Sequence, residues 1–188
     1  MNKYDRRRKY FLILDCETAT LPHAINYIDE ERKNIAIAKP LIYDLGWQVV
    51  DYQGRVYAKK NFLISEIFSV PAVFDTAYYA EKRPLYLEKL DKGEIMLTDW
   101  RTAVRELIED MDACVAVGAY NSMFDFKKAI PCTELYINQL YSPDFHKWLD
   151  YQNSRVDLLA TGRKFDNPYE FDETIFRFRG KEYPLFDL

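Results

Sequence analysis

Apolar positions in the first third of the chain predict three strands. Residues 10–16 form a continuous apolar and aromatic run, which is typical of a strand buried on both faces. Residues 41–51 predict a second strand and residues 55–64 a third. The Gln53-Gly54 turn between these two runs predicts that they pair as a hairpin.

An amphipathic helix and another buried strand are predicted further along. Residues 99–111 carry apolar side chains at helical spacing, and either Thr98 or Asp99 is available as the N-cap. Residues 114–119 predict a buried strand. Parallel pairing of this strand with the first would place their carboxyl ends side by side, where open α/β sheets bind ligands.

The remaining predicted elements are short. A helix over residues 122–130 should end at Pro131, because proline interrupts a helix interior. Further elements are expected as short helices near 29–38, 72–82 and 155–164, and as a hairpin over 174–184 with its turn at Arg179-Gly180. This order of elements predicts one α/β domain over residues 1–188, with a mixed sheet flanked by helices.

Composition removes several classes of protein. The net charge of −4, from 26 basic and 30 acidic residues, excludes a uniformly basic protein that coats nucleic acid. Only 6 glycines are present and no glycine-rich phosphate loop occurs, while 3 cysteines without a C-x-x-C pair disfavour a zinc knuckle. The apolar stretch 10–14 is too short for a signal peptide or a membrane span. We therefore expect a cytoplasmic protein with no membrane partner.

Two carboxylates close the first predicted strand. Asp15 and Glu17 are separated by one residue, so on a strand they point to the same side, about 6.6 Å apart. Carboxylates held this close repel each other unless a cation lies between them, and Mg²⁺ and Mn²⁺ prefer such oxygen ligands. Taken alone, the pattern is explained more simply by two surface carboxylates at a strand end.

A second polar pair follows the predicted strand 114–119. Asn121 can cap the next helix, and Asp125 lies one turn further on the same face. If that strand neighbours the first, Asp125 faces Asp15 and Glu17 across the crevice. A solvated aspartate favoured by the helix dipole explains Asp125 about as well.

In this order, the two pairs resemble the DEDD superfamily of 3′–5′ exonucleases, which includes the proofreading epsilon-like subunits and RNase T. Asp15-Cys16-Glu17-Thr18 matches the family's first motif, D-x-E-T, and Asn121 with Asp125 matches the second, N-x-x-x-D. Residues 156–160 are similar to the family's D-x-L helix, so the resemblance covers about residues 10–165. It implies an RNase H-like fold and hydrolysis of phosphodiester bonds at the 3′ end of DNA or RNA.

The resemblance also implies roles for individual residues. Asp15, Glu17 and Asp125 would be the catalytic carboxylates and would hold two Mg²⁺ or Mn²⁺ ions, which in such sites lie about 4 Å apart. Thr18 would lie near the terminal nucleotide, and Asn121 would contact the substrate or support the second motif. The implied partner is a nucleic acid with a 3′ end.

The family's third motif, H-x-x-x-x-D or Y-x-x-x-D on a late helix, has no good match. Tyr183 and Asp187 have the second spacing, but Pro184 follows the tyrosine and one residue follows the aspartate, which disfavours a helix. We predict Tyr183 to be a strand residue and expect the third motif beyond residue 188, so that this chain binds metal less well and could be inactive.

Two alternatives to the exonuclease remain open. The first is a non-catalytic module with a nuclease fold that binds nucleic acid or a partner protein, for which the apolar end of the chain would offer a contact surface. The second is another RNase H-like enzyme, such as an endonuclease, which the D-x-E-T pairing disfavours.

Overall fold

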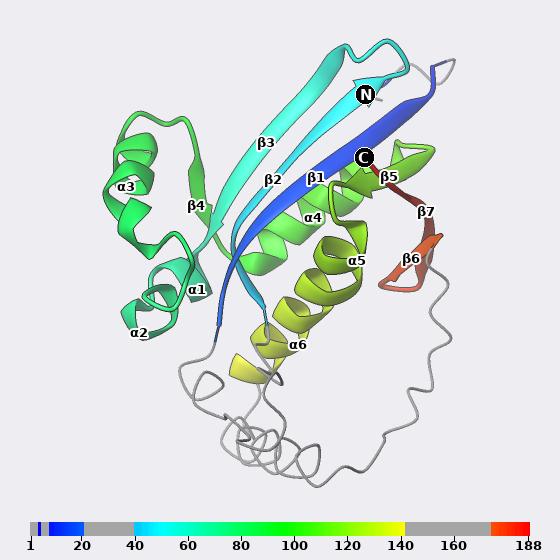
Figure 1. Cartoon of the computed structure of the whole chain (residues 1–188). Coiled ribbons are helices and arrows are strands. Elements are labelled where there is room, and N and C mark those ends of the chain that lie inside the picture. The colour runs from blue at the N-terminus through cyan, green and yellow to red at the C-terminus, as the bar shows by residue number, and fades with distance from the viewer. Residues whose placement is uncertain (1–3, 5–7, 21–39, 142–173) are drawn as a thin grey trace, which may run out of the picture.

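A seven-stranded mixed sheet with the strand order β4-β3-β2-β1-β5-β7-β6 forms the centre of the molecule (Figure 1). The computed structural model describes residues 4, 8–20, 40–141 and 174–188. Helices flank the sheet, as expected for an α/β protein (Figure 1). The expected helices near 29–38 and 155–164, and the segment 156–160, lie outside the described residues.

The strands are β1 (Tyr10–Ala19), β2 (Leu41–Asp51), β3 (Val56–Ile64), β4 (Met96–Thr98), β5 (Ala116–Ala119), β6 (Ile175–Phe178) and β7 (Lys181–Asp187). The α-helices are α1 (Ser65–Phe68), α2 (Pro71–Phe74), α3 (Arg83–Asp91), α4 (Trp100–Asp112), α5 (Ser122–Phe124) and α6 (Ile130–Leu140). A 3₁₀ turn, η2 (Ala80–Lys82), precedes α3, and a π-helical turn, η3 (Asp125–Ala129), joins α5 to α6. Among the described helices, none combines the length and apolar character needed to cross a bilayer.

The predicted hairpin is confirmed, and the parallel pairing on which the expected ligand site was conditional is present. β1, β2 and β3 form an antiparallel meander. Its second turn is stabilised by Asp51, whose Oδ1 accepts hydrogen bonds from the amides of Gln53 and Arg55 at 2.9 and 3.0 Å. On its other side β1 pairs in parallel with β5. The carboxyl ends of β1 and β5 therefore lie beside each other, where a ligand site was expected.

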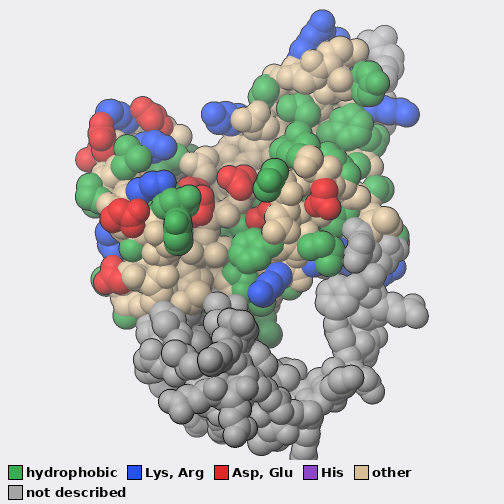
Figure 2. Space-filling view, viewed as in Figure 1, with side chains coloured by type: hydrophobic (Ala, Val, Ile, Leu, Met, Phe, Trp, Pro, Cys, Tyr) green, Lys and Arg blue, Asp and Glu red, His purple; other side chains and the backbone are tan. Residues whose placement is uncertain are grey.

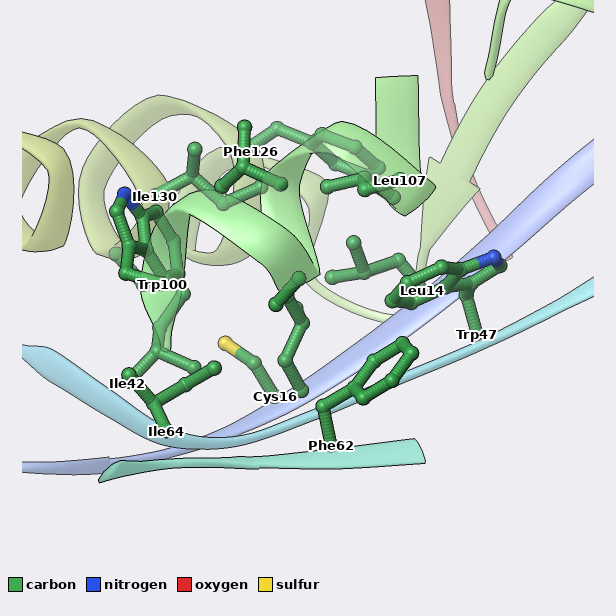
Figure 3. Close-up of a cluster of buried hydrophobic side chains, with 14 of the residues drawn as sticks. Leu14, Cys16, Ile42, Trp47, Phe62, Ile64, Trp100, Leu107, Phe126 and Ile130 are labelled. Carbon is green, nitrogen blue, oxygen red and sulfur yellow. The ribbon is translucent and has the colours of Figure 1, made fainter. Parts of the chain in front are cut away.

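One face of the sheet is covered by helices and holds the core. Side chains of β1 alternate, so Leu12, Leu14 and Cys16 are buried on this face. Figure 3 shows Leu14 and Cys16 among the side chains of Trp100 and Leu107 from α4. Burial of a large apolar side chain stabilises the folded state by about 1.5–3 kcal/mol. The helix predicted over residues 99–111 is confirmed as α4 (Trp100–Asp112), whose buried face packs on the sheet.

The opposite face of the sheet is partly open, which corrects the prediction that the first strand is buried on both faces. Ile13 is half-buried and Asp15 is exposed on this face. The strand also continues past residue 16 to Ala19. Because Asp15 and Glu17 therefore lie within β1, their backbone is fixed by pairing with β2.

The prediction that a helix ends at Pro131 is wrong, because α6 continues through Pro131 to Leu140. A regular helix would bring the proline ring against the carbonyl four residues earlier. In the π-helical turn η3, the amide of Ile130 instead donates to the carbonyl of Asp125, five residues back. This wider turn directly precedes the proline, and π turns of this kind are frequent at functional sites.

The region between β3 and α4 differs from the expected single helix near 72–82. It contains α1, α2, η2, α3 and the short strand β4, which together lie beside one end of the sheet (Figure 1). Phe68 and Phe74 pack edge to face against each other and against Tyr43 or Tyr86. We call these elements, residues 65–98, the side lobe.

The late hairpin is confirmed as β6 and β7. Arg179 and Gly180 have φ values of 46° and 79°, which is typical of the two-residue turns that favour glycine. β7 also pairs in parallel with β5, so the hairpin joins the main sheet. Tyr183 is a buried residue of β7, as predicted, and its hydroxyl donates to Asp112 Oδ1 at 2.9 Å.

Candidate functional site

Asp15 and Glu17 lie on the open face of β1, next to the side lobe. In the register of the β1–β2 pair, Asp15 is opposite Gly46 and Glu17 is opposite Asp44. Asp15 is exposed and Glu17 is half-buried. The sequence prediction that these two carboxylates share one side of a strand agrees with the alternation of burial along β1.

A β-bulge lies directly beside this pair. The register shifts between Glu17 and Thr18, which leaves Tyr43 as an extra residue on β2. Bulges bend a strand and re-aim its side chains, and they are common next to active sites. Thr18 pairs with Ile42, and the alternation of β1 places the Thr18 side chain on the helix-covered face, with Cys16 and opposite to Asp15.

Asp125 reaches β1 from the helix-covered face. Asn121 caps α5, since its Oδ1 accepts a hydrogen bond from the amide of Phe124 at 3.1 Å. Asp125 follows in η3 and is only 5% exposed. The thiol of Cys16 donates a hydrogen bond to Asp125 Oδ1 at 2.9 Å. The second carboxylate motif therefore contacts the residue that lies between Asp15 and Glu17.

The orientation of the Asp125 side chain differs from the one that the sequence predicted. Asn121 is exposed whereas Asp125 is buried, so the two side chains do not share one face as the helical spacing predicted. The cause is local, because α5 spans only three residues before the wider η3 turn begins. Asp125 consequently turns toward Cys16 instead of pointing across the open face.

The pKa of Asp125 is raised to about 6. Burial of the carboxyl group is the largest cause, and the negative charge of Asp15 adds to it. The hydrogen bond from the Cys16 thiol opposes both by stabilising the ionised form. The charge of Asp15 therefore raises the pKa of Asp125, although Asp15 lies on the open face of β1 and Asp125 lies on the helix-covered side.

Glu17 also has a raised pKa, caused first by burial and then by the charges of Asp15 and Asp44. Lys82 of the side lobe opposes this effect. Burial likewise raises the pKa of Asp44, although the amide of Asn61, which donates to Asp44 Oδ1 at 2.5 Å, lowers it. The open face thus holds carboxyl groups that repel one another, a situation that a bound cation would relieve.

The donor chemistry of this cluster suits Mg²⁺ or Mn²⁺, because all of its ligand groups are carboxylate oxygens. Within the described residues, however, no three His, Cys, Asp or Glu side chains lie close enough together to hold one ion. Asp15 and Glu17 form the pair on one face, and Asp125 approaches from the other. The carboxylates agree in type with a divalent-metal site, but they are not gathered around one point.

Asp187 contacts the start of α5. It ends β7 and accepts a hydrogen bond from the amide of Ser122 at 2.9 Å, which lowers the pKa of Asp187. This contact satisfies a free amide at the start of α5. Asp187 therefore makes a capping contact with α5. Tyr183 lies in the strand β7, in agreement with the prediction that it is a strand residue.

A groove of about 740 Å³ runs from Asp15 across the open face toward the side lobe. Its floor includes Gly46, and its sides carry Lys59, Asn61 and Lys89. Figure 2 shows this hollow between the side lobe and the sheet, with acidic side chains gathered over β1. Volumes of about 300–1,000 Å³ are typical of ligand sites.

Asp44, Asn61 and Lys82 also neighbour the carboxylate pair, although they were not predicted from the sequence. A signal for Asp44 was present, because residues 44, 46 and 48 are Asp, Gly and Gln, a run of polar or small residues on one side of an otherwise apolar strand. The positions of Asn61 and Lys82 depend on strand register and on the side lobe, for which the sequence holds no comparable signal.

Comparisons with protein-family models, with curated proteins and with solved structures found no match to this chain. The fold and the site therefore define the protein only as an α/β protein with a seven-stranded mixed sheet and a carboxylate-bearing groove on its open face.

Proposed function

We propose that this chain is a metal-dependent 3′–5′ exonuclease with an RNase H-like fold. The observation that carries the proposal is the contact between Cys16 and Asp125 at 2.9 Å, across 109 positions of sequence. Because Cys16 lies between Asp15 and Glu17, this contact joins a residue of the first motif of the DEDD resemblance to the aspartate of the second.

The topology supports the proposal at the level of the fold. β2 and β3 lie on one side of the central strand β1 and complete an antiparallel meander with it, and the parallel strands β5 and β7 lie on the other side. The chain crosses from β5 through α5 and α6 before it returns to the sheet. Asp125 is at the start of this crossover, at the carboxyl end of β5, where open α/β sheets place their ligands.

In the proposed mechanism Asp15 and Glu17 would hold Mg²⁺ or Mn²⁺, and Asp125 would be the third carboxylate. Bound divalent ions would supply a nucleophilic water and stabilise the charge of the leaving 3′ oxygen. Asp15 and Glu17 are held together by the β1–β2 pairing. The Cys16 thiol fixes Asp125 and favours its ionised form, which is the form that ligates a cation.

A second candidate function is a non-catalytic module that binds nucleic acid or a protein. It is favoured by the separation of Asp125 from the open face and by the lack, among the described residues, of three gathered ligands. For this candidate, binding would survive the double substitution of Asp15→Asn and Asp125→Asn.

The proposal is tested with a 5′-labelled single-stranded oligonucleotide in Mn²⁺ and in EDTA. The exonuclease predicts progressive shortening in Mn²⁺ only, and at least a hundredfold slower shortening by Asp15→Asn. Asp91→Asn removes an exposed carboxylate from α3, outside the lining of the groove, and should retain the wild-type rate. Metal-dependent shortening at equal rates by wild type and Asp15→Asn would refute the assignment of the site.

A further inference from the structure

The open face carries an aromatic shelf on the side of β1 away from the groove. A Cβ atom added to Gly118 of β5 would lie 2.5 Å from the ring of Phe186, so this ring rests directly on the β5 backbone. The ring of Phe11 meets it edge to face, with centroids 6.2 Å apart. Both phenylalanines are only partly buried, so the shelf is accessible from the open face.

On the other side of β1, the groove is lined by lysines together with two carboxylates, one of them that of Asp15. Gly46 lies opposite Asp15, and a Cβ added there would come within 3.2 Å of Asn61 Nδ2. Because Gly46 has no side chain, the groove is deeper at this position. Lys59 of β3 and Lys89 of α3 line the same groove.

In the strand register, Phe186 and Lys59 lie on the row of Ile13, which is next to the row of Asp15 on the same face. From β5 to β3 the sheet advances by three strand spacings, or about 14 Å. Partly exposed aromatic rings on a sheet face stack well on nucleic-acid bases, and lysines in a groove neutralise phosphates. Base-stacking rings together with ammonium groups suit a nucleic acid, whereas an apolar peptide would use only the rings.

We propose that the open face is a binding platform for single-stranded nucleic acid, in which a base stacks on Phe186 and Phe11 and the phosphates follow the groove to Lys59 and Lys89. A single strand is the occupant because stacking on the shelf requires an unpaired base. The platform deepens the proposed function, since it supplies the substrate surface around Asp15, but binding to it requires no catalysis.

The test measures binding of a fluorescein-labelled ten-nucleotide single strand by anisotropy, in EDTA to prevent cleavage and over a series of salt concentrations. Phe186→Leu keeps apolar contact but removes the ring, and should weaken binding about 5- to 150-fold, the range of base–aromatic stacking. Gly118→Ala should weaken binding as well, because the added methyl group displaces the Phe186 ring. Thermal melts establish that both variants are folded.

The contribution of the two lysines is measured separately, from the salt dependence of binding. Each of Lys59→Gln and Lys89→Gln should reduce the slope of log affinity against log salt by about 0.7, the value for one phosphate contact on a single strand. Two controls should leave binding unchanged: Lys92→Gln, whose ammonium pairs with Glu88, and Tyr141→Leu, which removes an exposed ring at the end of α6.

The outcomes separate this inference from the exonuclease proposal. Wild-type affinity in folded Phe186→Leu together with unchanged salt slopes in both lysine variants would overturn the platform, even if the chain degrades nucleic acid. Weakened binding in these variants would support the platform, even if no cleavage occurs. A matched duplex that binds as tightly as the single strand would also overturn it.

Discussion

The thiol of Cys16 donates a hydrogen bond to the carboxylate of Asp125, with the sulfur and the oxygen 2.9 Å apart. This contact links the central strand β1 to the turn that begins the α5–α6 crossover. It also stabilises the charge on Asp125, because a hydrogen bond donated to a carboxylate favours the ionised form. Several expected outcomes depend on this one contact.

Substitution of Cys16 should change the acidity of Asp125. Cys16→Ala removes the donor, so the pKa of Asp125 should rise above its present value of about 6, by about half a unit to one unit. Cys16→Ser retains a donor and should change the pKa less. Carbon-13 NMR titration of the side-chain carboxyl group measures both values, and an equal pKa in Cys16→Ala and wild type would contradict the importance of the thiol.

The raised pKa of Asp125 also predicts how stability depends on pH. The folded protein holds this proton up to about pH 6, whereas the unfolded chain releases it near pH 3.8. The stability that Asp125 contributes by keeping its proton in the folded state is therefore fully present below pH 3.8. It is lost as the pH rises through about 6. The difference of about two pH units corresponds to roughly 3 kcal/mol.

Asp125→Asn isolates this contribution, because asparagine keeps an acceptor for Cys16 but cannot ionise. The free energy of unfolding of the variant relative to wild type should increase by about 2–3 kcal/mol between pH 3.5 and pH 7. Urea unfolding at the two pH values measures this difference, in which the other titrating groups cancel. A difference that is independent of pH would show that Asp125 is not perturbed by burial.

A divalent cation should stabilise the protein through the carboxylates on the open face. Mn²⁺ at a hundred times its Kd would add about 2.7 kcal/mol, which for a chain of 188 residues corresponds to a rise in Tm of about 5–10 °C. Asp15→Asn and Glu17→Gln should each lose most of this rise, while Asp91→Asn should keep it. An identical shift in all three variants would place the binding of Mn²⁺ elsewhere.

A buried polar network on the helix-covered face predicts a large loss of stability. Asp110 is 1% exposed and accepts hydrogen bonds from Tyr4 at 2.6 Å and from Trp47 at 2.9 Å. It also pairs with Lys60 at 2.9 Å. These contacts outweigh burial and lower the pKa of Asp110.

Asp110→Ala leaves the ammonium of Lys60 and two buried donors without this acceptor, and should cost about 3–5 kcal/mol in urea unfolding. Glu109→Ala, at an exposed position one residue earlier on α4, is the matched control and should change stability by less than about 0.5 kcal/mol. Equal effects of the two substitutions would mean that the network contributes little.

The sequence pattern predicted those parts of the fold that local signals specify. The β2–β3 hairpin follows from an apolar run on each side of Gln53-Gly54, and α4 follows from helical spacing after a capping Asp99. The course of the chain at Pro131 was not predictable in this way. It depends on the π-helical turn of η3, which no single residue type specifies.

In the candidate site, too, some positions follow from local sequence pattern and others depend on tertiary contacts. The position of Asp15 and Glu17 on one face of β1 follows from the two-residue period of a strand, and capping by Asn121 follows from its residue type. Cys16 is buried, as expected for a position that alternates with Asp15 and Glu17 along the strand. Its bond to Asp125 is a tertiary contact that local pattern does not encode, and neither is the placement of Asp44.

The central claim is that the chain hydrolyses nucleic acid from a free 3′ end with a metal held by Asp15. The most direct measurement compares linear and circular single-stranded DNA of one sequence in Mn²⁺, with wild type and Asp15→Asn. We predict release of mononucleotides from the linear molecule by wild type only, and none from the circle. Cleavage of the circle, or equal release from the linear molecule by wild type and Asp15→Asn, would contradict the account.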